Sequence, residues 1–66
     1  MSPEEARQRI EWAIGQFGGH AAPMLEQVMA EVRSSLGTET ANDLIDEFDL
    51  ELEYNIPPTE IEGSGD

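Results

Sequence analysis

The chain contains no cysteine and no lysine, and it has only three arginine residues. Without cysteine, neither a disulfide nor a thiolate-bound zinc ion can stabilise the fold. Direct binding of nucleic acid requires clustered positive charge, and three scattered arginines do not provide it. These absences exclude disulfide-stapled domains and direct nucleic-acid binders.

Long apolar runs are missing as well. No run approaches the roughly 18 residues of a membrane span, and the N-terminus lacks the basic and apolar regions of a signal peptide. We therefore expect a soluble, cytoplasmic protein that makes no membrane contact. At 66 residues the chain is one small domain at most. A domain of that size buries only about 60% of its unfolded surface, which predicts marginal stability.

Acidic residues are abundant and unevenly placed. The chain has 15 Asp and Glu residues and a formal net charge of −12. Residues 1–33 carry five acidic residues and three arginines, whereas residues 34–66 carry ten acidic residues and no base. This asymmetry indicates an acidic interaction surface. The alternative is a solvated face that only keeps the chain soluble.

Capping residues and apolar spacing predict two helices in the first half. One covers about residues 3–17, because Ser2 can cap its N-terminus and Pro3 suits its first position. The next covers about residues 23–36 and ends at Gly37, where a left-handed C-terminal cap is expected.

A third, longer helix is predicted over about residues 39–54. The strict polar–apolar alternation of residues 49–56 is also typical of a strand. The helix is favoured because Leu52 continues the helical apolar stripe and a lone strand would have no partner in the chain. Pro57 and Pro58 then end the helix, since the residue before a proline avoids the helical region.

Together these segments predict an all-α fold, either a small three-helix bundle or a helical hairpin with a longer acidic third helix. Residues 1–56 would form a single helical domain, and residues 57–66 a flexible acidic tail. The apolar stripes give the expected core, which consists of Ile10, Ile14, Phe17, Leu25, Val28, Met29, Val32, Leu44, Ile45 and Phe48. A core this small favours pairing with a partner or with a second copy of the chain as a homodimer.

The third helix would align its acidic side chains in two rows. One row contains Glu39, Asp43, Glu47 and Glu51, and the second contains Asp46, Asp49 and Glu53. Four like-charged pairs at this spacing destabilise a helix by about 1–2 kcal/mol in total. No base lies nearby in the sequence to relieve the repulsion, and this favours docking of the rows on a basic partner.

Three large apolar residues fall outside the stripes, namely Trp12, Leu50 and Tyr54. Trp and Tyr are enriched where binding energy concentrates, because each buries a large rigid surface and keeps one polar group. We expect these residues to anchor a partner or a second copy. The alternative is that Trp12 covers a thin core and that Leu50 and Tyr54 are simply exposed, as single apolar residues often are.

The residue types needed for catalysis are sparse. His20 is the only histidine, and it lies in a glycine-rich loop with no nucleophile beside it. The acidic run over residues 43–53 lacks the alternating Asp/Asn pattern and the central glycine of a calcium loop. We therefore expect a protein that is not an enzyme and that has no cofactor and no metal site.

One stretch is similar to a known family. Leu36-Gly37-Thr38-Glu39-Thr40-Ala41, running on to Glu53-Tyr54-Asn55-Ile56, resembles the acidic second helix of acyl carrier proteins over about a third of the chain. In that family the helix follows an Asp-Ser-Leu motif whose serine bears phosphopantetheine. This chain has Glu39-Thr40-Ala41 at that place, so no prosthetic-group site is implied.

The leading functional hypothesis is a small non-catalytic module that docks its third helix on a basic surface of a partner protein. A sub-case is a regulatory inhibitor that mimics nucleic acid, because carboxylates one helical turn apart lie about 6 Å from each other, near the phosphate spacing of one strand. The partner would then be a nucleic-acid-binding protein. The alternative is an accessory structural subunit of a larger assembly, and a carrier-protein-like role ranks third.

Overall fold

The computed structural model describes residues 1–59, and these residues are mostly helical. Within them no strand is formed, so the all-α fold class is confirmed and the strand interpretation of residues 49–56 is wrong. The elements are α1 (Pro3–Phe17), the 3-10 helix η1 (Gly18–His20), α2 (Ala22–Leu36), α3 (Thr38–Glu47) and α4 (Leu50–Tyr54). None of these helices is long and apolar enough to cross a lipid bilayer.

Local signals at the N-terminus of α1 explain why this helix begins where it does. The Ser2 hydroxyl accepts a hydrogen bond from the Glu5 N–H at 3.1 Å, and Pro3 occupies the first turn.

The connection between α2 and α3 passes through Gly37 at a φ of 102°. This backbone conformation is open to glycine and strained for residues that carry a side chain.

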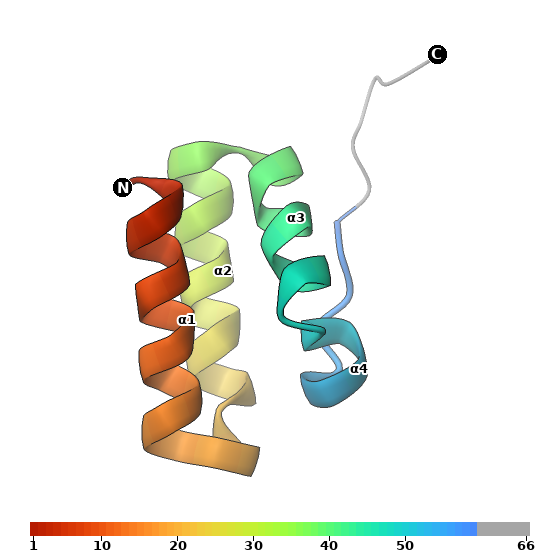
Figure 1. Cartoon of the computed structure of the whole chain (residues 1–66). Coiled ribbons are helices and arrows are strands. Elements are labelled where there is room, and N and C mark those ends of the chain that lie inside the picture. The colour runs from red at the N-terminus through yellow and green to blue at the C-terminus, as the bar shows by residue number, and fades with distance from the viewer. Residues whose placement is uncertain (60–66) are drawn as a thin grey trace.

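The helices form a small bundle in which α2 packs against both α1 and α3 (Figure 1). The first two helices make an antiparallel hairpin, and α4 turns back beneath the end of α3 (Figure 1). Residues 55–59 then run back along α3 (Figure 1). The tail predicted over residues 57–66 lies outside the described residues from residue 60 onward.

The single helix predicted over residues 39–54 is instead two helices, separated by a turn at Phe48 and Asp49. Asp49 has the left-handed backbone angles φ 55° and ψ 40°, which a continuous helix does not allow. The change of direction buries Leu50 completely and leaves Leu52 82% exposed. Leu50 is therefore buried and Leu52 exposed, which is the reverse of what a continuous helix predicts.

Burial of apolar side chains explains why the turn forms. Leu50 and Ile56 are 0% and 4% exposed, and burial of such a side chain contributes about 1.5–3 kcal/mol. Left-handed angles at Asp49 and Asn55 cost roughly 1–2 kcal/mol per residue, and less for Asp and Asn than for other side chains. The gain from the two buried side chains therefore offsets the cost of the two strained positions.

The core lies between α1, α2, α3 and α4. Seven of the predicted residues are buried in it, namely Ile10, Leu25, Val28, Met29, Val32, Leu44 and Ile45. Ile14 and Phe48 are only partly buried at its edge. Phe17 was expected in the core but is 41% exposed, because α1 ends there and the chain turns into η1.

Candidate partner-binding surface

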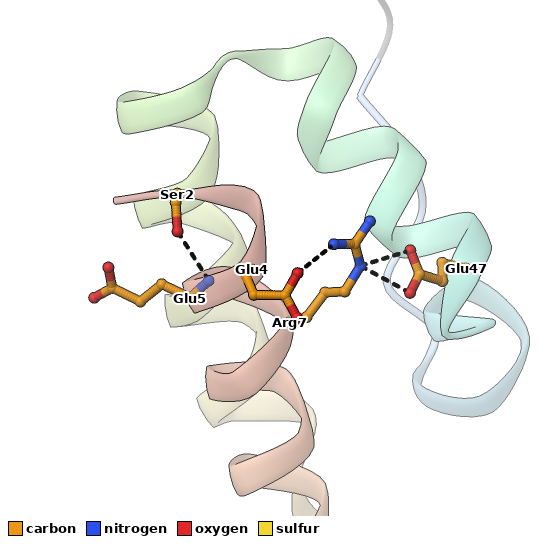
Figure 2. A network of polar contacts seen from close by, with 5 residues as sticks. All are labelled: Ser2, Glu4, Glu5, Arg7 and Glu47. Atoms are coloured by element: carbon orange, nitrogen blue, oxygen red, sulfur yellow. Dashed lines mark hydrogen bonds and ion pairs between the residues drawn. The ribbon is translucent and has the colours of Figure 1, made fainter.

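One of the predicted binding residues, Glu47, is held in an ion pair between α1 and α3 (Figure 2). The Arg7 Nε donates to both Glu47 carboxylate oxygens at 3.1 and 3.0 Å, and its Nη1 donates to Glu4 at 3.3 Å. The hydrogen bond and the charge of Glu47 raise the pKa of Arg7 above its ordinary value. The expectation that no base relieves this acidic segment is therefore wrong at Glu47.

The two predicted carboxylate rows are not continuous. Because α3 ends at Glu47, Glu51 lies on α4 and leaves the row that begins with Glu39 and Asp43. The second row, Asp46, Asp49 and Glu53, is divided between α3, the turn and α4. All seven acidic side chains are nevertheless exposed, so this half of the molecule presents an acidic surface without straight rows.

A surface hollow of about 380 Å³ forms where α3, α4 and the chain after α4 meet. We call it the acidic hollow; its lining residues are Asn42, Ile45, Asp46, Asp49, Glu51, Leu52, Asn55 and Pro58. Among residues 1–59, no Arg lies within ion-pair distance of its three carboxylates. The acidic hollow thus combines unneutralised negative charge with the exposed apolar side chain of Leu52.

Asn42 fixes one wall of the acidic hollow. Its Oδ1 accepts from the Thr59 N–H at 2.9 Å, and its Nδ2 donates to the Thr59 carbonyl at 2.8 Å. The two bonds hold the neighbouring Pro58 beside α3. The sequence carries no signal for this role, because an Asn within a helical pattern does not reveal a partner 17 positions away.

The three predicted apolar anchors have different environments. Trp12 is 53% exposed, as an anchor must be, and it lies on α1 rather than beside the acidic hollow. Leu50 is fully buried, so its predicted contact with a partner is wrong. Tyr54 is half-buried against the core. Leu52, which was expected to continue the apolar stripe of the third helix, is the apolar side chain that α4 exposes.

The remaining chemistry of the described part is limited. His20 is exposed in η1, and residues 1–59 contain no cluster of three His, Asp or Glu side chains arranged to hold a metal ion. Comparisons with known protein families, curated proteins and solved structures give no significant match. Function is therefore inferred from the geometry and charge of the surface.

Proposed function

We propose that the chain is a small, non-catalytic protein-binding module that docks the acidic hollow on a basic surface of a partner protein. The observation that carries the proposal is the hollow itself. Asp46, Asp49 and Glu51 surround an exposed Leu52, and no Arg among the described residues neutralises the three carboxylates.

A lysine or arginine side chain has the matching chemistry. Its long apolar stem packs on apolar surface while its charged end pairs with carboxylates. In the acidic hollow, Leu52 and Pro58 offer the apolar surface and three acidic residues border it. A volume of about 380 Å³ lies within the range of sites that enclose small groups. The acidic hollow thus suits one or two basic side chains of a partner.

Charge and apolar contact would have separate effects on binding. A net charge of −12, with most of it in residues 34–66, attracts a basic partner at long range and speeds association. Once the partner is docked, desolvated contact with Leu52 slows dissociation. Because salt screens exposed charges beyond about 10 Å at 0.1 M, the association rate should fall as salt is added.

An inhibitory role follows for a partner that uses the same basic surface to bind nucleic acid. Occupation of that surface by the acidic hollow would exclude the nucleic acid by competition. Mimicry of a phosphate strand is a weaker form of this hypothesis, since only Glu39, Asp43 and Glu47 remain in line and Glu47 is paired with Arg7. Competition by duplex DNA for an identified partner tests the inhibitory role.

The experiment is an affinity capture of partners at low and high salt, followed by association kinetics with each purified partner. Glu51→Lys should slow association strongly, and the difference from the parent should shrink at high salt. Glu11→Lys is the matched control, because Glu11 is exposed on α1, makes no ion pair among residues 1–59 and gives the same change in net charge.

Leu52→Ala should instead speed dissociation with little salt dependence, because it removes apolar contact and no charge. Equal binding by Glu51→Lys and the parent would refute the proposal. Binding that changes neither with salt nor with Glu51→Lys would favour the accessory-subunit hypothesis.

A further inference from the structure

A second surface lies on the side of α1 that faces away from α3. Two arginines of α1 show the two sides: Arg7 pairs with Glu47 on α3, and Arg9 pairs with Glu31 on α2. Positions two apart in a helix are about 200° apart around its axis. The side that carries Arg9 also carries a groove of about 290 Å³, lined by Arg9, Trp12, Met24, Gln27, Val28 and Glu31. We call it the aromatic groove.

Large apolar side chains are exposed in and beside the aromatic groove. Trp12 is 53% exposed, and Phe17, which is 41% exposed, meets it edge to face with ring centroids 5.9 Å apart. Met24 is half-buried in the groove lining. Removal of these side chains from water would favour association, since an aromatic side chain buries 150–250 Å² when it is fully covered.

Charges around the aromatic groove are partly compensated within the chain. Arg9 donates to Glu31 across the groove and to Glu5 at 3.4 Å on its own helix. Residues 1–33 have a net charge of −2, against −12 for the whole chain. A basic partner therefore gains little electrostatic attraction here, and a second acidic chain meets less repulsion here than at α3 and α4.

We propose that the aromatic groove is the contact between two copies of this chain. A twofold axis would place the Trp12 and Met24 side chains of each copy against the groove of the other, because such an interface uses the same patch twice. The α1–α2 hairpins of the two copies would then form a four-helix arrangement. Both acidic hollows would stay outside the contact.

The dimensions of the α1–α2 hairpin set the affinity expected for the dimer. Each helix has 15 residues, which corresponds to about 22 Å of length, and packed helices lie about 8–10 Å apart. The face of the hairpin thus covers on the order of 400–500 Å² per copy, so the total of about 800–1,000 Å² lies below the standard size of specific interfaces and in the range of weak, transient ones. We expect reversible association in the micromolar range.

Sedimentation of the full chain from about 1 µM to about 1 mM tests the proposal. The mass should rise from 7.3 kDa towards twice that value. Trp12 is the only tryptophan, so its emission should shift to the blue, and its quenching by acrylamide should fall, over the same concentrations. Added salt should strengthen the dimer because it screens the remaining repulsion, whereas salt weakens docking at the acidic hollow.

Trp12→Ala should raise the dissociation constant at least about tenfold. The exposed Leu52 on α4 supplies the control, and Leu52→Ala should dimerise like the parent. A monomer throughout the range at low and high salt would overturn the proposal, as would a dimer in which the Trp12 emission stays unchanged. Loss of the dimer in Leu52→Ala but not in Trp12→Ala would also overturn it. If Trp12→Ala fails to fold, the concentration dependence of the Trp12 emission in the parent chain tests the proposal instead.

Discussion

The Arg7 guanidinium on α1 contacts the Glu47 carboxylate in the last turn of α3, 40 positions away in the sequence (Figure 2). That turn contains Asp46 and Glu47 and no basic residue. Carboxylates at a helix C-terminus are unfavourable, because the helix dipole is negative there. Arg7 therefore supplies, from another helix, the positive charge that the end of α3 lacks.

Neutralisation of Glu47 and of Asp43 should have opposite effects on the free energy of unfolding. Asp43→Asn removes an exposed charge with no ion pair among residues 1–59, so it should stabilise the protein by relief of repulsion. Glu47→Gln should destabilise it, because the variant loses the ion pair with Arg7. Urea unfolding followed by circular dichroism measures both. Stabilisation by both variants would show that the Arg7 pair contributes nothing.

The pH dependence of this ion pair follows from the raised pKa of Arg7. A group whose pKa is raised on folding contributes its full stabilisation below its unfolded value and loses it as the pH rises through the folded value. Arginine titrates only far above neutrality. Between pH 6 and about 9, the difference in stability between Arg7→Gln and the parent should therefore stay constant; a change within that range would contradict the assignment.

Leu50 and Leu52 form a matched pair that tests the break between α3 and α4. Leu50→Ala should lower the free energy of unfolding by about 2–5 kcal/mol, because the side chain is fully buried. Leu52→Ala should change it by less than about 0.5 kcal/mol, since Leu52 is 82% exposed. A continuous helix would give the reverse order in denaturant unfolding.

Asp49→Gly should stabilise the protein by up to about 1 kcal/mol, because glycine adopts left-handed angles without steric cost. Asp49 makes no side-chain cap hydrogen bond, so no such bond is lost. Asp49→Asn separates charge from backbone strain, since it removes the carboxylate and retains a side chain. Thermal unfolding should give a higher melting temperature for the Gly variant than for the Asn variant. Equal melting temperatures for the two variants would mean that any stabilisation comes from removal of the charge alone.

Salt should raise the melting temperature of the free protein. Acidic residues outnumber basic ones by 15 to 3, so screening relieves more repulsion than it weakens attraction. Scanning calorimetry from low ionic strength to about 0.15 M tests this expectation. A melting temperature that falls with salt would mean that the four ion pairs of Arg7 and Arg9 outweigh the repulsion.

The first helix could be predicted because its signals are local. Ser2 and Pro3 mark its start, and the buried Ala6, Ile10 and Ala13 follow at helical spacing. The break at Asp49 could not be predicted in this way. Leu and Glu are strong helix formers, and the break depends on the burial of Leu50 in the core, which helix propensity does not report.

The candidate surface shows the same limit. Charge counting located the acidic half of the molecule, since it depends only on composition. It missed Arg7 as the partner of Glu47 and Asn42 as the support of the acidic hollow, because both contacts join residues far apart in the sequence. The apolar stripe of a continuous helix also misplaced Leu50 and Leu52, since the left-handed conformation of Asp49 reorients the side chains that follow.

The contact between Asn42 and Thr59 has a consequence for how related sequences can diverge. Asn42 bonds the main-chain N–H and carbonyl of Thr59 and makes no hydrogen bond to its side chain. Any residue except proline, which lacks the N–H, can therefore occupy position 59 without loss of either bond. Position 42 has no such freedom, because an aspartate there would lack the donor. Among relatives of this chain, the residue at position 59 should vary, whereas position 42 should retain an asparagine.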